Sequence, residues 1–154
     1  MTTVDRAVRA RLLWMWVWVM LNMIFADIFA FMNAGALQQI MEGRADQIAI
    51  TPEFLLLAAA LTEIPIAMVV LSQVLPRRAN RWANVVAGIF AIVYVVGVGS
   101  ITLSYIFFAG LETLGCLYIV WLAWSWHGSD HPVTARGRPA GPVAPRPSPV
   151  ENKA

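Results

Sequence analysis

Long uninterrupted runs of apolar residues dominate the chain, and four of them are long enough to cross a bilayer. A helix needs about 20 apolar residues to span the hydrocarbon core. The runs fall at about residues 12–31, 54–75, 82–102 and 105–126. They are continuously apolar and about twice as long as the strands of a membrane barrel, so we expect helices. The pattern predicts an all-α membrane protein, a four-helix transmembrane bundle over residues 12–126.

Turn and cap residues mark the ends of these predicted helices. Pro52 lies at the start of the second run, where its missing N–H costs no hydrogen bond, and Pro76 ends that run. Pro65, inside the same run, is predicted to kink it. Asn80 is the predicted N-cap of the third helix. In the first loop, residues 33–51, the stretch ALQQIMEGR fits either a short helix on the membrane interface or a plain connector.

The composition agrees with a membrane protein rather than a soluble domain. The chain is 59% hydrophobic and 13% charged, against roughly 25% charged residues in an average soluble domain. A soluble chain of this length could not bury so much apolar surface. The single cysteine, Cys116, excludes an intrachain disulfide. Residues 127–154 are rich in proline, glycine and small polar residues, so we predict a disordered Pro-rich tail.

The cationic residues lie on one side of the predicted bundle. Ten of the eleven arginines and lysines fall in residues 1–11, in the second loop or in the tail, and Arg44 in the first loop is the eleventh. Because positive charges mark cytoplasmic loops, both termini are predicted to be cytoplasmic. The tryptophans lie near the same ends of the helices and predict a one-sided aromatic belt: Trp14, Trp16, Trp18, Trp82, Trp121, Trp124 and Trp126.

The first apolar run has an alternative interpretation. Arginines, an apolar run and the sequence AGA at residues 34–36 are also the features of a cleavable signal peptide. The run is longer than the apolar region of a signal peptide, and Asp27 interrupts it. We therefore favour an uncleaved signal anchor.

Three carboxylates interrupt the apolar runs: Asp27 in the first, Glu63 in the second and Glu112 in the fourth. From the helix rise of 1.5 Å per residue, Glu63 lies about 15 Å from the outer end of its helix, and the other two lie in the outer half of the membrane. Small residues surround each acid at helical spacing, which indicates faces inside the bundle. Because no base lies within a run, we expect these acids to be protonated, to hold a cation or to face a water-filled cleft.

The acids form the candidate polar or proton site, because ionisable residues inside a membrane are functional candidates by default. Glu63 is its predicted centre, with Glu112 and Asp27 above it and with Asn22 and Tyr94 as hydrogen-bonding neighbours. The structural alternative is that protonated carboxyls only bond neighbouring helices, which contributes under about 1 kcal/mol each.

The second loop, in LPRRANRWANVVAG, brings three arginines to the start of the third helix. The simpler interpretation is a positively charged cytoplasmic anchor. The more specific one is an anionic lipid headgroup held by Arg77, Arg78, Arg81 and Asn80 at the helix N-terminus.

No catalytic, cofactor or metal motif is found. GxGxxG, P-loop, HExxH and CxxC patterns are absent, so we predict no cofactor and lean against an enzyme, although acids alone could perform acid–base chemistry on a lipid. HGSDH at residues 127–131 has no further ligand nearby, so no metal site is predicted. No basic patch lies outside the membrane-flanking positions, which argues against nucleic acid.

Several segments resemble an uncharacterised family of small bacterial four-helix integral membrane proteins. They are FADIFAFMNAG, EIPIAMVVLSQVL, RANRWANVVAG and YIFFAGLE, of which RANRWAN is the specific part. The resemblance covers residues 12–126 and implies a multi-pass protein of a bacterial cytoplasmic (inner) membrane, with no activity attached. A more remote resemblance is to the DoxX-like four-helix proteins, with which the chain shares no catalytic motif.

The function that we expect is a membrane-embedded binding or accessory protein with a buried acidic site. It would work among membrane lipids as a homo-oligomer or in a larger membrane complex, because small-residue faces suit further helix packing. The alternative is a proton-coupled carrier of small cationic or lipophilic molecules. Small multidrug exporters share four helices and an intramembrane acid, but the one-sided charge here argues against their antiparallel dimers.

Overall fold

Four long helices form the frame of the computed structural model, which describes residues 3–45, 48–98 and 101–126. The shortest long helix has 22 residues and is about 33 Å long, against a hydrocarbon core of about 30 Å. All four are long and apolar enough to cross a membrane, so the predicted class of helical multi-pass membrane protein is confirmed. The elements are α1 (Thr3–Phe31), α2 (Ala36–Met41), β1 (Arg44–Ala45), β2 (Ile48–Ala49), α3 (Pro52–Val74), α4 (Arg77–Val98) and α5 (Leu103–Ser125).

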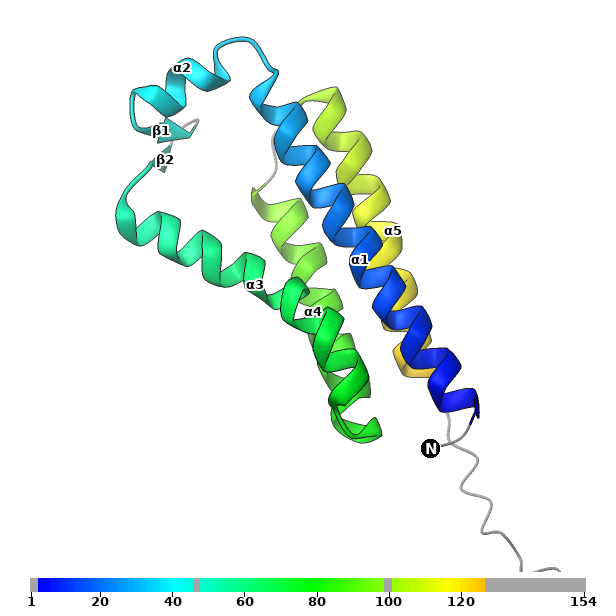
Figure 1. The fold of residues 1–154 in the computed structure, drawn as a ribbon. Coiled ribbons are helices and arrows are strands. Elements are labelled where there is room, and N and C mark those ends of the chain that lie inside the picture. The colour runs from blue at the N-terminus through cyan, green and yellow to red at the C-terminus, as the bar shows by residue number, and fades with distance from the viewer. Residues whose placement is uncertain (1–2, 46–47, 99–100, 127–154) are drawn as a thin grey trace, which may run out of the picture.

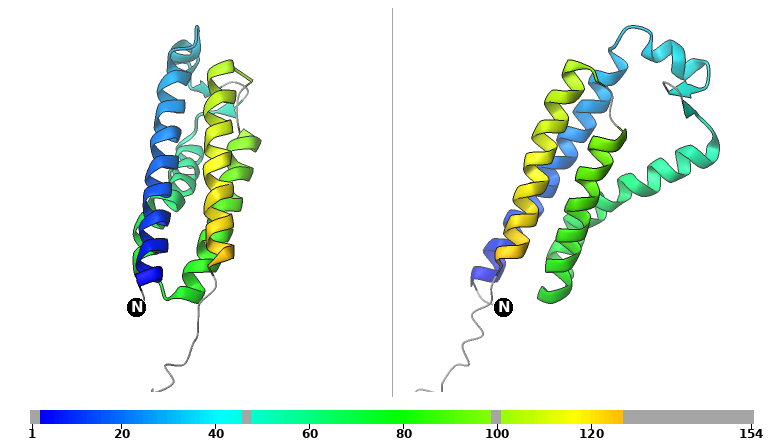
Figure 2. Two further views of the ribbon diagram at one scale, coloured as in Figure 1. Left: turned by 90° about the vertical axis from the view of Figure 1, so that its right-hand side faces the viewer. Right: turned by 180° about the vertical axis from the view of Figure 1, so that it is seen from behind.

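α5 lies between α1 and α4 and packs along both of them (Figures 1 and 2). The start of α1, the end of α5 and the turn from α3 to α4 lie together at one end of the bundle (Figure 1). We call this the basic end, because it holds Arg9, Arg77 and Arg81. α2 and the β1–β2 hairpin lie at the opposite end, which we call the loop end.

Two glycines allow α5 to approach its neighbours closely. A Cβ atom on Gly115 would lie 2.6 Å from the ring of Trp18 on α1. A Cβ atom on Gly88 of α4 would lie 2.7 Å from a methyl group of Val120. Small residues at such crossings are typical of helices that associate in lipid, where close backbone packing replaces the hydrophobic effect.

α3 is bent, and only its second half packs into the bundle (Figure 1). Its buried residues are Pro65, Met68 and Ser72, all in that half. In the first half, Leu56 is 73% exposed. Pro65 is the proline inside this helix, and its ring removes a backbone hydrogen bond to the carbonyl of Leu61, which accounts for the bend.

The ends of α3 follow the predicted signals, whereas the start of α4 does not. The Thr51 hydroxyl accepts a hydrogen bond from the Phe54 N–H at 3.2 Å, with Pro52 in the first turn. The helix ends at Val74, before an extended Leu75 and Pro76. The expectation that Asn80 caps α4 is wrong, because the helix begins at Arg77 and the Asn80 N–H already donates to the Pro76 carbonyl at 2.8 Å.

The connection between α1 and α3 has more structure than a plain loop. Of the two interpretations of ALQQIMEGR, the short helix is the one that is present, as α2. The β1–β2 hairpin follows it, with Arg44 opposite Ala49, and no pattern in the sequence predicted this pair. Gly35 and Gly43 flank α2 with φ angles of 82° and 75°, a left-handed conformation that favours glycine.

The predicted disorder of residues 127–154, and the HGSDH stretch within them, lie outside the described residues.

Candidate functional site

A cavity of about 140 Å³ lies where α1, α3, α4 and α5 converge. For scale, an engineered protein cavity of about 150 Å³ holds benzene. Its polar lining comes from all four helices: Asp27, Thr62, Tyr94, Tyr105 and Glu112. Its apolar lining comes from α1 and α3: Met20, Met23, Ile24, Ala26, Pro65 and Ile66.

Helical periodicity brings Asp27 and Glu112 to this cavity. On α5, Glu112 precedes the buried residues Gly115, Cys116 and Ile119 at spacings of three, four and seven, so it shares the face that packs against the bundle. On α1, Asp27 follows Met23 by four residues and Met20 by seven, and all three line the cavity. The two acids therefore face each other from neighbouring helices.

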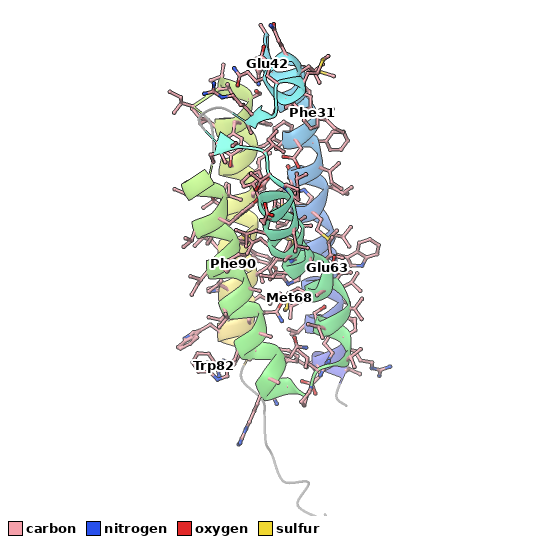
Figure 3. The ribbon with its side chains drawn as sticks, turned by 90° about the vertical axis from the view of Figure 1, so that its left-hand side faces the viewer. Phe31, Glu42, Glu63, Met68, Trp82 and Phe90 are labelled. Carbon is pink, nitrogen blue, oxygen red and sulfur yellow. The ribbon has the colours of Figure 1, made fainter. Side chains whose placement is uncertain are left out.

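Glu63 does not line this cavity. The residues of α3 that do so are Thr62, Pro65 and Ile66, which are spaced as one helical face. Glu63 follows Thr62 by one residue, which turns it about 100° around the helix axis. Its side chain is exposed, and Figure 3 shows its position on α3 above Met68. The structure therefore brings two of the three predicted acids together and leaves the expected centre outside.

Small residues pointed to the wrong face of α3. Ala59, Ala60 and Ala67 surround Glu63 at helical spacing, which predicted an interior face. Ala59 and Ala60 are exposed, because the first half of α3 leans away from the other helices. A small-residue face marks helix packing only where a second helix is within reach.

Of the two hydrogen-bonding neighbours that the sequence predicted for the acids, one lines the cavity and the other does not. Tyr94 lines the cavity. The Asn22 side chain instead donates to the Trp18 carbonyl of its own helix at 2.8 Å and does not line the cavity. Tyr105 was missed, although it precedes Glu112 by seven residues and therefore shares its helix face. Its hydroxyl donates to the Val95 carbonyl at 2.7 Å, which ties the start of α5 to α4.

The charge balance of the cavity is one-sided. Glu112 is only 3% exposed, and its Oε1 atom is buried without a hydrogen-bond partner. An unpaired buried polar atom costs about 1–3 kcal/mol, and more when it is charged. Asp27 lines the same cavity with a second carboxylate, and two like charges in one cavity repel each other. No Lys, Arg or His is among the described residues that line the cavity, so its carboxylates can take up protons or a cation but have no positively charged side chain beside them.

A second polar cluster, at the basic end, was not anticipated. Arg9 is 8% exposed, and its guanidinium donates to three carbonyls at the end of α3. The distances are 3.3 Å to Ser72, 2.7 Å to Gln73 and 2.8 Å to Leu75. The Gln73 amide donates back to the Arg9 carbonyl at 2.8 Å. A cation at the C-terminal end of a helix also interacts favourably with the helix dipole, so Arg9 fastens α1 to α3.

Two asparagines extend this cluster into the core. Asn80 and Asn84 are both fully buried. The Asn80 amide donates to the Ser72 carbonyl at 2.6 Å, and the Asn84 amide donates to the Asn80 side chain at 2.6 Å. The Trp16 indole N–H donates to Asn84 Oδ1 at 2.7 Å. Asn80 is therefore not at the surface, where a headgroup contact would require it.

The tryptophans near the basic end include buried and exposed residues, and two of them pack against arginines. The Arg81 guanidinium lies 4.8 Å from the Trp124 ring centre, and Arg77 lies 5.7 Å from that of Trp126. Trp16 and Trp126 are buried, so the prediction that they belong to an aromatic belt is wrong. The exposed tryptophans are Trp14, Trp18, Trp82, Trp121 and Trp124.

Comparison with known proteins identifies a family but no activity. The model of a family of unknown function, DUF6326, matches residues 3–132, which is most of the chain. No curated protein and no solved structure gives a significant match. The chain, a small protein with four apolar spanning helices, belongs to this family of unknown function.

Proposed function

We propose that this protein is a membrane-embedded binding protein that holds a positively charged ligand in the cavity between its four long helices. The observation that carries the proposal is the buried Oε1 atom of Glu112, which has no hydrogen-bond partner among the described residues; Glu112 lines a cavity that has no Lys, Arg or His among its described lining residues. A cation bound there would supply the missing partner. A buried charge without its partner is costly, so a bound cation would remove the cost of the unpaired Glu112 carboxylate.

The rest of the lining supports a cationic ligand. Asp27 adds a second carboxylate from the opposite helix. Tyr94 is also among the residues that line this space, and aromatic side chains attract cations. The remaining walls are apolar, as in most small-molecule sites, where a few polar groups fix the orientation of the ligand.

The proposal includes an orientation in the membrane. The arginines of α1 and α4 gather at the basic end, and Arg44 lies near the loop end. With the basic end in the cytoplasm of a bacterium, the cavity belongs to the outer half of the inner membrane. Arg77, Arg78 and Arg81 would then meet lipid phosphates, and further copies or other membrane proteins would pack on the apolar outer faces. A periplasmic reporter fused at residue 78 that became active would contradict this orientation.

The binding test compares two glutamates. Purified protein in nanodiscs is titrated with propylammonium, and we expect Glu112→Gln to weaken binding by about tenfold or more, or at least ~1.4 kcal/mol. Glu63→Gln is the matched control, because it removes the same charge from an exposed position on α3. Asp27→Asn provides a second variant if Glu112→Gln does not fold. Loss of binding in Glu63→Gln alone would move the site to Glu63 and contradict the proposal.

A proton-coupled carrier is the second candidate, because two carboxylates line one cavity. Two like charges that share a cavity are stabilised when one of them holds a proton, and an arriving cation would displace that proton. Proteoliposomes with a pH-sensitive dye inside test this function. Outward proton flux that depends on an inward amine gradient, and that Glu112→Gln abolishes, would establish a carrier; amine binding without proton flux would leave a binding protein.

A further inference from the structure

A second hollow, entirely apolar, borders the cavity on the outside of α1 and α3. It measures about 270 Å³ and lies between Val17–Ile24 on α1 and Ile66–Val70 on α3. We call it the α1–α3 groove. Met20, Ile24 and Ile66 line both the groove and the cavity. The two hollows therefore lie side by side and share these three residues.

The α1–α3 groove runs along the two helices and is open on the outer surface of the bundle. Val17 lies ten residues before Asp27 on α1, which corresponds to about 15 Å along the helix axis, towards the basic end. Ile24 is 49% exposed and Val70 is 62% exposed. In a spanning bundle, side chains on such an outer surface face acyl chains rather than water. The groove is thus accessible from within the bilayer.

The two hollows have complementary chemistry. The cavity presents two carboxylates and no base among its described lining residues, whereas no polar surface is exposed in the groove. A molecule that fills both must have a compact cationic head and an apolar chain. A phospholipid fits poorly, because Asp27 and Glu112 would repel its phosphate.

We propose that the ligand is a single-chain cationic amphiphile that reaches its site sideways, from the bilayer, between α1 and α3. Its ammonium head lies between Asp27 and Glu112, and its alkyl chain lies in the α1–α3 groove. The inference rests on the proposed cation site and adds the class of ligand and its route. Pro65, the proline at the bend in α3, lines the cavity, and the next residue, Ile66, lines both the cavity and the groove.

The first test locates the chain. Protein in phosphatidylcholine nanodiscs is irradiated with dodecylammonium that carries a diazirine in mid-chain, and the adducts are mapped by mass spectrometry. We expect adducts in residues 17–24 and 66–70 that disappear in Glu112→Gln and under excess propylammonium. A dodecanol with the same diazirine is the control probe. Equal labelling by both probes, or labelling spread over the lipid face of α4, would contradict the proposal that the alkyl chain lies in the α1–α3 groove.

The second test fills the α1–α3 groove with a larger side chain and leaves Asp27 and Glu112 unchanged. Val70→Trp places an indole in the groove, and Val86→Trp places one on α4, where the valine is equally exposed at 62%. We expect Val70→Trp to weaken dodecylammonium binding by about tenfold relative to Val86→Trp. Propylammonium, which needs only the cavity, should bind equally to both variants.

These measurements separate the two proposals. If propylammonium binds and depends on Glu112 but dodecylammonium binding is the same in both tryptophan variants, the cation site stands and the lateral route is wrong. If propylammonium does not bind the wild-type protein at all, the cation site is wrong, and the amphiphile proposal fails with it.

Discussion

Asn84, together with Asn80, connects three helices. It accepts a hydrogen bond from Trp16 on α1, and its amide reaches Asn80, which in turn bonds the last turn of α3. All three residues are fully buried. In such a chain of bonds, removing one member leaves the others without partners in a place that water does not reach.

The first prediction is that Asn84→Ala destabilises the protein by about 1–3 kcal/mol, because the Trp16 N–H loses its acceptor and Asn80 Oδ1 loses its donor. Thermal unfolding in a mild detergent, followed by tryptophan fluorescence, measures the effect. Asn22→Ala is the control, since the Asn22 amide meets only a carbonyl of its own helix, and we expect a change within about 0.5 kcal/mol. Equal effects of both variants would contradict the role of this network.

Individual residues of the site also differ in how well the sequence could predict their positions. Asp27 and Glu112 stood out as unpaired acids in apolar runs, and Tyr105 was available from its spacing of seven to Glu112. The outward position of Glu63 was not available, because it depends on which face of α3 finds a neighbour. The burial of Arg9 has the same origin: only the arrival of the end of α3 gives its guanidinium the carbonyls that offset the loss of water.

At the scale of the helices, α5 packs so closely against α1 and α4 that glycine is needed at two contact positions. Gly115 faces the Trp18 ring, and Gly88 of α4 faces Val120, at distances that leave no room for a methyl group. Gly110 lies on α5 with nothing within 4 Å of the position of an added Cβ. The three glycines thus have equal chemistry and different surroundings.

The second prediction uses this difference. Gly88→Ala and Gly115→Ala are expected to destabilise the protein by about 1–3 kcal/mol each, because the helices must separate to admit the methyl group. Gly110→Ala is expected to be neutral or to stabilise the helix by up to about 1 kcal/mol. Unfolding in detergent measures all three. A destabilised Gly110→Ala together with an unaffected Gly115→Ala would contradict the close approach of α1 and α5.

The third prediction concerns the bend in α3. Pro65→Ala restores an N–H that can bond the Leu61 carbonyl, so α3 should straighten. Spin labels on cysteines introduced at Leu56 and Leu114, in a Cys116→Ser background, report the distance between α3 and α5 by pulsed electron resonance. We expect the distance distribution to shift in Pro65→Ala and to stay in place in Pro52→Ala, where the proline lies in the first turn. An unchanged distribution in Pro65→Ala would mean that packing, not the proline, causes the bend.

For the whole molecule, the chain order of long apolar runs already predicts the architecture. Four runs of spanning length, separated by short connections, allow little besides an antiparallel helical bundle. The hairpin of β1 and β2 was not predictable in this way, because strands of two residues carry no periodicity. The lean of the first half of α3 was equally hidden: Pro65 indicates a bend, but its direction depends on the helices around it.

The depth of Glu112 has an electrical consequence. It lies nine residues from the start of α5, or about 14 Å along the helix, which is roughly half of a hydrocarbon core of about 30 Å. A cation that moves to it from the loop end would cross about half of the transmembrane potential, worth about 1 kcal/mol per 100 mV. The fourth prediction is therefore that 100 mV, negative on the side of the basic end, tightens amine binding about fivefold. Potassium diffusion potentials in proteoliposomes of defined orientation measure this change, and affinity that ignores the voltage would place the bound charge at the membrane surface instead.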